Sequence, residues 1–167
     1  MKQDELRKLF DELHFTASLS LSPSTLDQLA AASVVQQFPA GTVLFREGTE
    51  NHRLYVLVYG SVALDMHVLG RGDVRILSLG PGDVLAWSAL IGEGRMTATA
   101  LALADTQVIA TSAQKLRELC EADHEFGFHL MRGMATALSK RLLATRLQLL
   151  DLFRDSEVAA HTGWTNP

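Results

Sequence analysis

The stretch that decides the fold is GPGDVLAWSALIGEGRMTATA, residues 80–100. It opens on Gly-Pro-Gly-Asp, a turn in which proline fixes φ at about −65° and glycine adopts conformations closed to other residues. The apolar segment 84–91 follows, long enough for two helical turns held by tertiary contacts. The glycine bend 92–94 ends this segment, and Arg95 stands alone before a strand-like run that begins at Thr97.

This pattern predicts a cradle for an anion. Backbone N–H groups at the start of a helix carry partial positive charge, and a guanidinium can close on a phosphate from the other side. We therefore expect Arg95 to face into the fold and to hold a negatively charged ligand. The alternative is that Arg95 is a solvated side chain after a glycine bend.

The composition is that of one globular domain in the cytoplasm. Of its 167 residues, 47% are hydrophobic and 20% charged, and the formal net charge of −4 gives no overall attraction to nucleic acid or anionic membranes. No apolar run approaches the roughly 18 residues of a membrane span, and the N-terminus MKQDELRK lacks the pattern of a signal peptide. The single cysteine, Cys120, excludes an intramolecular disulfide and favours a reducing compartment.

A β-rich middle lies between two helical ends. Residues 1–33 predict two N-terminal helices, the second starting at Ser22 and Pro23, a hydroxyl cap followed by a proline in the first turn. Residues 34–111 hold short β-branched runs punctuated by glycine, which predict eight strands in an antiparallel β-roll of jelly-roll type. An all-helical or βαβ fold fits less well, because no helix-length segment separates these strands. The fold class expected is mainly β with flanking α.

Residues 112–155 predict two C-terminal helices, a short one capped by Ser112 and a long one that begins at Asp123 and reaches about Phe153. The long helix carries a nearly heptad row of Met131, Met134, Leu138, Leu142, Thr145, Leu149 and Leu152, and a second row of Leu143, Leu147 and Leu150. One row can cover the roll while the other forms a homodimer. Residues 156–167 have no periodicity and predict a flexible tail.

The order of these elements resembles the cyclic nucleotide-binding domain family, which includes the sensory domains of catabolite-activator/FNR-type transcription factors and the regulatory subunits of cyclic-nucleotide-dependent kinases. The resemblance runs from about Leu6 to Phe153, and the domain that it implies spans residues 1–155. Its framework motifs are FPAGTVLFREG (38–48) and LYVLVYGSVAL (54–64). The motif LGPGDVLAWSALIGEGRMTATA (79–100) corresponds to the family's phosphate-binding cassette, placed here at residues 80–95.

The resemblance implies a ligand site on this cassette. Arg95 would pair with the cyclic phosphate, and backbone N–H groups around Trp87 to Ala89 would bind its other oxygens. The candidate ligand-binding residues are Arg95, Ala86, Trp87, Ser88, Ala89 and Thr97, of which Thr97 is the weaker contact. Trp87 is more plausible as a core or lid aromatic than as a platform for a base.

Two departures from the family pattern bear on the ligand. The family's Gly-Glu pair, whose glutamate accepts from the ribose 2′-OH, falls on Leu85 and Ala86 when counted back from Arg95. Losing that charge-assisted hydrogen bond costs about 1.5–3 kcal/mol, or about ten- to a hundredfold in affinity. One extra residue also separates Arg95 from Ala98 and Thr99, so a slip can turn a side chain to the other face.

The chain looks closer to a divergent branch with a small-Trp-Ser motif, here residues 86–88. In that motif Ser88 either replaces part of the lost polar contact or caps the short helix. The residues thus predict a non-catalytic, stand-alone regulatory domain that senses cyclic AMP, cyclic GMP or another small anion, with no other cofactor, and signals through its C-terminal helix to an unknown effector protein. The alternative is a degenerate, ligand-free domain used for dimerisation or partner docking.

Other functions find no support in the sequence. The six histidines and Cys120 lack metal-ligand spacing, and no nucleophile elbow or Walker loop is present. About a dozen residues follow the long helix, too few for a helix-turn-helix, so we expect no DNA binding by the chain itself. Lys140, Arg141 and Arg146 make the long helix locally basic, which a solvated face explains.

Overall fold

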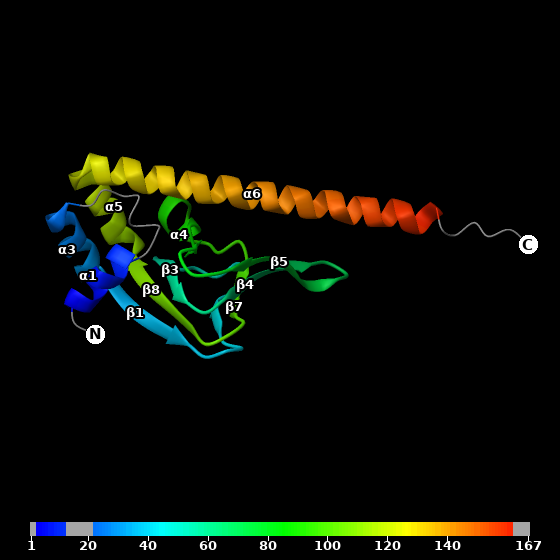
Figure 1. Cartoon of the computed structure of the whole chain (residues 1–167), viewed down its shortest axis with the longest axis horizontal. Coiled ribbons are helices and arrows are strands. Elements are labelled where there is room, and N and C mark those ends of the chain that lie inside the picture. The colour runs from blue at the N-terminus through cyan, green and yellow to red at the C-terminus, as the bar shows by residue number, and fades with distance from the viewer. Residues whose placement is uncertain (1–2, 13–21, 162–167) are drawn as a thin grey trace, which may run out of the picture.

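The fold is a β-roll with helices at both ends of the chain (Figure 1). The computed structural model describes the backbone of residues 3–12 and 22–161, and the side chains of residues 5–10, 12 and 22–147. The predicted fold class, mainly β with flanking α, is confirmed.

The N-terminal helices are α1 (Gln3–Glu12) and α3 (Pro23–Ala31). Ser22 caps α3 as predicted: its hydroxyl accepts a hydrogen bond from the Thr25 amide at 3.1 Å, and Pro23 occupies the first turn, where a missing N–H costs nothing. Both helices bury their apolar stripes against the first sheet and the C-terminal helices.

The middle of the chain forms two four-stranded sheets, and every neighbouring pair of strands is antiparallel. In spatial order, the first sheet contains β1 (Ser33–Phe38), β8 (Thr106–Ser112), β3 (Arg53–Tyr59) and β6 (Val84–Leu85). The second contains β2 (Val43–Phe45), β7 (Thr99–Ala102), β4 (Val62–Val68) and β5 (Gly72–Leu79). The prediction of eight short antiparallel strands is confirmed.

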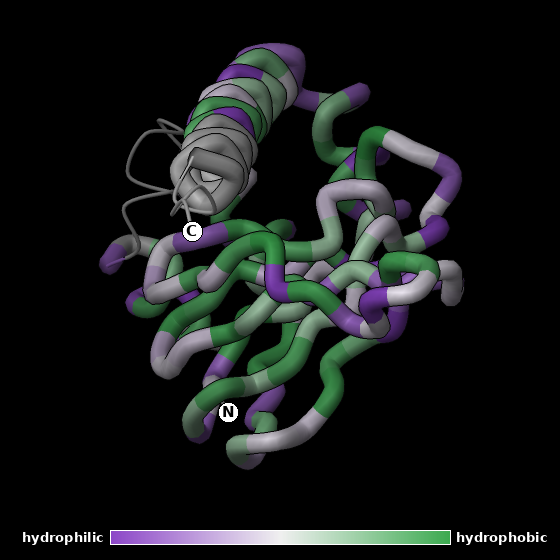
Figure 2. Tube along the Cα trace, turned by 90° about the vertical axis from the view of Figure 1, so that its right-hand side faces the viewer, coloured by the Kyte–Doolittle hydropathy of each residue, from purple (hydrophilic) through white to green (hydrophobic). Residues whose placement is uncertain are grey.

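The apolar residues form two separate cores. One core lies between the sheets and includes Leu57, Val62 and Val108. The other lies between the first sheet and the helices, and includes Phe10, Ile109 and Leu130. Figure 2 shows the apolar stretches that follow the strands of the roll. The first sheet therefore buries both of its faces.

Two helices close the chain, α5 (Ala113–Ala122) and α6 (His124–His161). Ser112 and Asp123 cap them as predicted, because the Ser112 hydroxyl accepts from the Lys115 amide at 3.4 Å and the Asp123 carboxylate accepts from the Phe126 amide at 2.9 Å. The Phe126 amide and then the Thr25 hydroxyl, 2.7 Å from the carboxylate, lower the pKa of Asp123. Asp123 thus fixes the start of α6 and ties it to α3.

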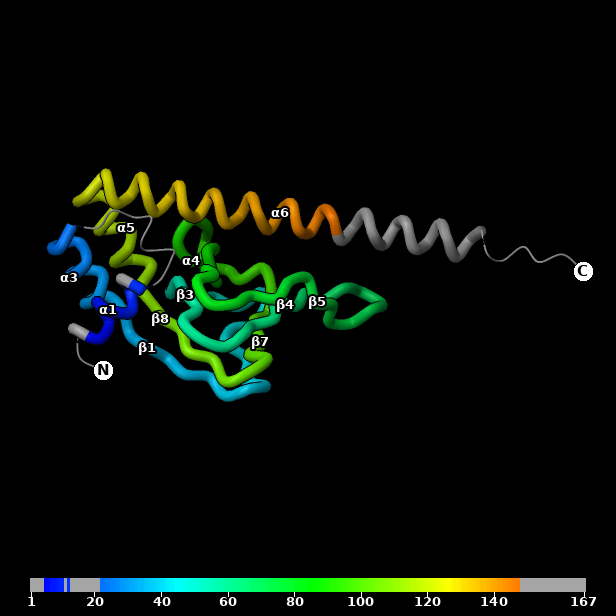
Figure 3. The backbone as a smooth tube through the Cα atoms, viewed as in Figure 1, coloured from blue at the N-terminus to red at the C-terminus, as the bar shows by residue number. Residues whose placement is uncertain are grey.

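The helix α6 extends well past the roll (Figure 1), and Figure 3 shows its earlier part lying along the roll. It continues to His161, so the predicted tail boundary at residue 156 is wrong, because the Ser-Glu-Val-Ala-Ala run that follows Asp155 is compatible with a helix. Residues 162–167 lie outside the described part of the chain. Within that part, no helix combines the length and apolarity that crossing a bilayer requires.

The glycine turns give a direct test of the roll's packing. Gly60, between β3 and β4, has φ +93°, and a methyl group there would lie 2.5 Å from the Asp105 carbonyl oxygen. Gly70, between β4 and β5, has φ +81° but nothing within 4 Å. We expect Gly70→Ala to lower the free energy of unfolding by about 1–2 kcal/mol, the cost of the left-handed conformation. Gly60→Ala should lose about 1–3 kcal/mol more, because the new methyl group overpacks the turn.

Urea unfolding of the two variants and the parent measures both losses. Equal losses for Gly60→Ala and Gly70→Ala would contradict the close approach of Gly60 to the turn at Asp105.

Candidate functional site

The cassette begins with a tight turn packed on β3. The Gly80 amide donates to the Asp83 carboxylate at 2.9 Å, and the Gly82 amide donates to the Leu57 carbonyl at 2.7 Å. Val84 and Leu85 then pair with β3 as the two-residue strand β6.

Helical structure in the cassette is confined to α4 (Ser88–Ile91). The prediction of two helical turns over residues 84–91 is therefore wrong in its first half. Pairing with β3 satisfies the backbone of β6 and suits the β-branched Val84 better than a helix would.

Ala86 is the hinge between β6 and α4. Its φ of +57° lies in the left-handed region, and it is the sole non-glycine residue there in the described part of the chain. This region favours glycine, so the backbone places Ala86 at the glycine of the family's Gly-Glu pair and Trp87 at the glutamate. By this criterion the pair lies one residue later than in the register counted back from Arg95, which puts it at Leu85 and Ala86.

The next three residues lie in different surroundings. Trp87 is half-buried and packs against the helical core, whereas Ala89 is buried between the sheets. Ser88 is buried as the first residue of α4, with Trp87 at the cap position, so the alternative role of Ser88 as the helix cap is wrong. The Ala89 amide donates to the Ala86 carbonyl at 3.0 Å, which closes the turn into α4.

Arg95 does not face into the roll. Residues 94–96 run antiparallel to residues 48–51, and alternation along this short ladder buries Met96 between the sheets while Arg95 and Thr97 are exposed. The Arg95 guanidinium donates to the Gly48 carbonyl at 3.1 Å. The expected inward orientation of Arg95 is thus corrected, because Met96 takes the inward position. The extra residue relative to the family pattern, between Arg95 and Ala98, follows this exposed arginine.

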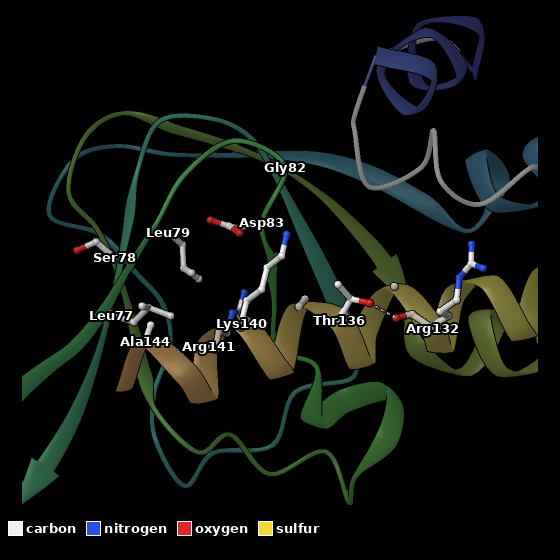
Figure 4. A pocket seen from close by; sticks show the side chains of 12 residues that line it. Leu77, Ser78, Leu79, Gly82, Asp83, Arg132, Thr136, Lys140, Arg141 and Ala144 are labelled. Carbon is white, nitrogen blue, oxygen red and sulfur yellow. Dashed lines mark hydrogen bonds between the residues drawn. The ribbon is translucent and has the colours of Figure 1, made fainter. Parts of the chain in front are cut away.

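A hollow of about 570 Å³ lies next to the cassette, between the end of β5, the turn before β6 and one face of α6 (Figure 4). Its lining residues are Leu77, Ser78, Leu79, Gly82, Asp83, Arg132, Gly133, Thr136, Ala137, Lys140, Arg141 and Ala144. None of the six predicted site residues is among them. Ala86 and Ala89 are buried between the sheets, Trp87 packs against the helical core, Ser88 is buried, and Arg95 and Thr97 are exposed.

The hollow is basic. It contains Arg132, Lys140 and Arg141 from α6, against one acidic residue, Asp83. Figure 4 shows Asp83 and Lys140 directed into the space between the turn and the helix. The Arg141 side chain reaches the cassette backbone, where its guanidinium donates to the Val84 carbonyl. The pKa of Arg141 is lowered, because the effect of burial is larger than the opposing effect of the Asp83 carboxylate.

Sequence reasoning missed these cations, because it assigned the positive charge of the long helix to a solvated face. A signal was present in the spacing. Arg141 follows the buried Phe126, Leu130 and Met134 at helical intervals, which places it on the face that meets the roll. In the described side chains, no cluster of three or more histidine, cysteine or acidic residues could hold a metal ion.

Comparison with known proteins gives one consistent family. The model of the cyclic nucleotide-binding domain matches residues 35–123. The chain is 27% identical over 165 residues to the cyclic AMP receptor protein of Thermus thermophilus, covering 86% of this chain and 76% of that protein. It is 24% identical to the CRP-like cAMP-activated global transcriptional regulator of Mycobacterium tuberculosis, of which it spans 57%.

Solved structures agree. A putative cyclic nucleotide-binding protein of Geobacter metallireducens GS-15 has a TM-score of 0.69 and 29% identity, over 85% of this chain and 98% of that one. A cyclic nucleotide-binding domain from Methylobacillus flagellatus KT has a TM-score of 0.74 at 17% identity, which shows the likeness of fold alone. Family members are regulatory proteins rather than enzymes. With the matching family model, the roll, the cassette and the long C-terminal helix together, the chain belongs to the cyclic nucleotide-binding domain family.

Proposed function

We propose that the chain is a non-catalytic regulatory domain that binds a small anionic ligand, nominally cyclic AMP or cyclic GMP, beside its cassette and signals through α6. The observation that carries this proposal is the basic hollow, because its two walls are the turn that leads into the cassette and the helix that extends away from the roll. A ligand held there contacts both at once. Its binding free energy can therefore shift the position of α6.

The chemistry of the hollow suits an anion with an apolar part. Leu77, Leu79 and Ala144 offer apolar surface, and Ser78 and Thr136 offer hydroxyl groups. Lys140 supplies a charge that is free to move to a phosphate, since its long side chain is exposed. A pocket with apolar walls and a few convergent polar groups is the usual form of a small-molecule site.

Arg95 is a secondary candidate for binding the anion. Its contact with the Gly48 carbonyl uses one of five guanidinium donors, so it retains the capacity to bind an anion that reaches the 94–97 segment. A cytoplasmic location, inferred from the single cysteine, stays a prediction.

The alternative function is a degenerate domain used for dimerisation or docking of an effector protein. Trp87 favours it, because the side chain at the position of the family's ligand-binding glutamate packs into the helical core instead. The exposed position of Arg95 favours it too. The basic hollow favours the sensor.

Titration calorimetry separates the two functions. We expect cyclic AMP or cyclic GMP to bind, and Lys140→Gln to weaken binding by about three- to tenfold, since an exposed charge contributes on the order of 1 kcal/mol. Arg146→Gln is the matched control, because Arg146 is an exposed cation on α6 outside the hollow, and it should leave the affinity unchanged.

The same titration with Arg95→Ala tests where the anion binds. A loss with Arg95→Ala and none with Lys140→Gln would place the ligand on the 94–97 segment and contradict the hollow as the site. Absence of heat with either nucleotide at high micromolar concentration would favour the docking domain.

We also propose that the chain forms a homodimer through α6. Where α6 runs alongside the roll, it exposes Leu142, Leu143 and Leu147 at 53%, 59% and 54%. The row that includes Phe126, Leu130 and Met134 is buried in the core of the same chain, so it cannot contact a partner. An exposed leucine stripe on a helix that projects from its domain is a liability in a monomer and is covered by a second copy in a coiled-coil arrangement.

Sedimentation velocity over a concentration series tests the dimer. We expect Leu143→Glu combined with Leu147→Glu to convert dimer to monomer, because a charge at the seam is buried without a partner. Leu69→Glu is the control, since Leu69 is 93% exposed and lies on the turn between β4 and β5, not on α6. A parent chain that sediments as a monomer at every concentration would contradict the proposal.

A further inference from the structure

Two arginines reach the cassette from the two C-terminal helices. Arg117 of α5 donates from one guanidinium nitrogen to the carbonyls of Ala89 and Leu90, at 2.9 and 3.2 Å. Arg141 of α6 donates to the carbonyl of Val84. The two guanidinium groups therefore bind the backbone on both sides of the hinge at Ala86.

These carbonyls need such donors. The last carbonyls of a helix have no partner within it, and α4 has four residues, so most of its carbonyls depend on groups outside the helix. The strand β6 has two residues and one neighbouring strand, β3. Charge-assisted hydrogen bonds are stronger than neutral ones, which gives the two arginines a large share in holding residues 84–91.

Arg141 differs from the other cations of α6. Arg132 lies 5.7 Å from the centre of the Phe128 ring on its own helix, and Arg146 is exposed. Arg141 is half-buried, faces Asp83 across the hollow and contacts the cassette backbone directly. A basic side chain is held there at a cost in hydration, which its contacts with the cassette offset.

We propose that Arg117 and Arg141 are positioning residues that set the conformation of the cassette segment 84–91 from α5 and α6. A displacement of α6 that breaks the contact with Val84 changes the cassette, and a change in the cassette releases α6. This inference deepens the proposed function by naming the groups through which the ligand site and the output helix are coupled. Its test needs no ligand, so it stands or falls separately from nucleotide binding.

Trp87 is a built-in reporter, because it lies between Val84 and Ala89 in the sequence and its side chain packs against the helical core. Trp164 is the other tryptophan, so Trp164→Phe leaves Trp87 as the sole tryptophan. In that background we expect Arg141→Gln to shift the Trp87 emission to the red and to raise its quenching by acrylamide about twofold. Arg141→Lys should restore part of the parent spectrum, because it keeps a charged donor.

Hydrogen exchange gives the local measurement. We expect Arg141→Gln and Arg117→Gln to speed exchange of the amides of residues 86–91 by about tenfold, the factor for one lost charge-assisted hydrogen bond. Exchange in β3 and β8 should stay unchanged. The matched controls are Arg146→Gln on α6 and Lys115→Gln on α5, which remove cations that do not touch the cassette.

Trp87 emission and hydrogen exchange together decide whether the two arginines position the cassette. A cassette-specific change with Arg141→Gln or Arg117→Gln, and none with the controls, supports the inference. If Trp87 emission and exchange of residues 86–91 match those of the controls, the inference is overturned. If Arg141→Gln does not fold, Arg141→Lys and Arg117→Gln decide the outcome with the same two measurements. Equal acceleration of exchange in the cassette, β3 and β8 assigns the arginines a merely structural role and also overturns it.

Discussion

Residues 84–91 bury side chains in two cores at once, and the arrangement around the site depends on this constraint. Val84 and Leu90 belong to the core beneath the helices, while Leu85 and Ala89 belong to the core between the sheets. The backbone can serve both cores because it turns sharply at Ala86, which accepts a left-handed conformation to do so. The segment therefore cannot move without disturbing a core.

This double anchorage suits a regulatory domain. Close-packed cores respond to a local change by switching between arrangements rather than by gradual deformation. The helix α6 lies against the same segment, bounds the basic hollow and continues beyond the roll (Figure 1). A ligand in the hollow and a partner on the distal part of α6 would then act on one rigid element from its two ends.

The divergence of the cassette follows one physical pattern, in which apolar anchorage replaces polar contacts. Trp87 fills part of the helical core at the position where the family pattern has a glutamate, and Met96 occupies the inward position next to Arg95. Both side chains stabilise the cassette through burial. The positive charges beside the cassette lie on α6, on Lys140 and Arg141.

Local patterns in the sequence were enough to predict the fold class, the order of helices and strands, and the helix starts at Ser22, Ser112 and Asp123. Glycine turns, caps and apolar periods act over a few neighbouring residues, so they can be read without the tertiary structure. The sequence also located the cassette. Only the tertiary structure decided that Arg95 is exposed and that Arg141 meets the cassette. Those outcomes depend on strand pairing between residues 94–96 and 48–51 and on the seating of α6 against the roll, contacts between segments far apart in the chain that no local pattern encodes.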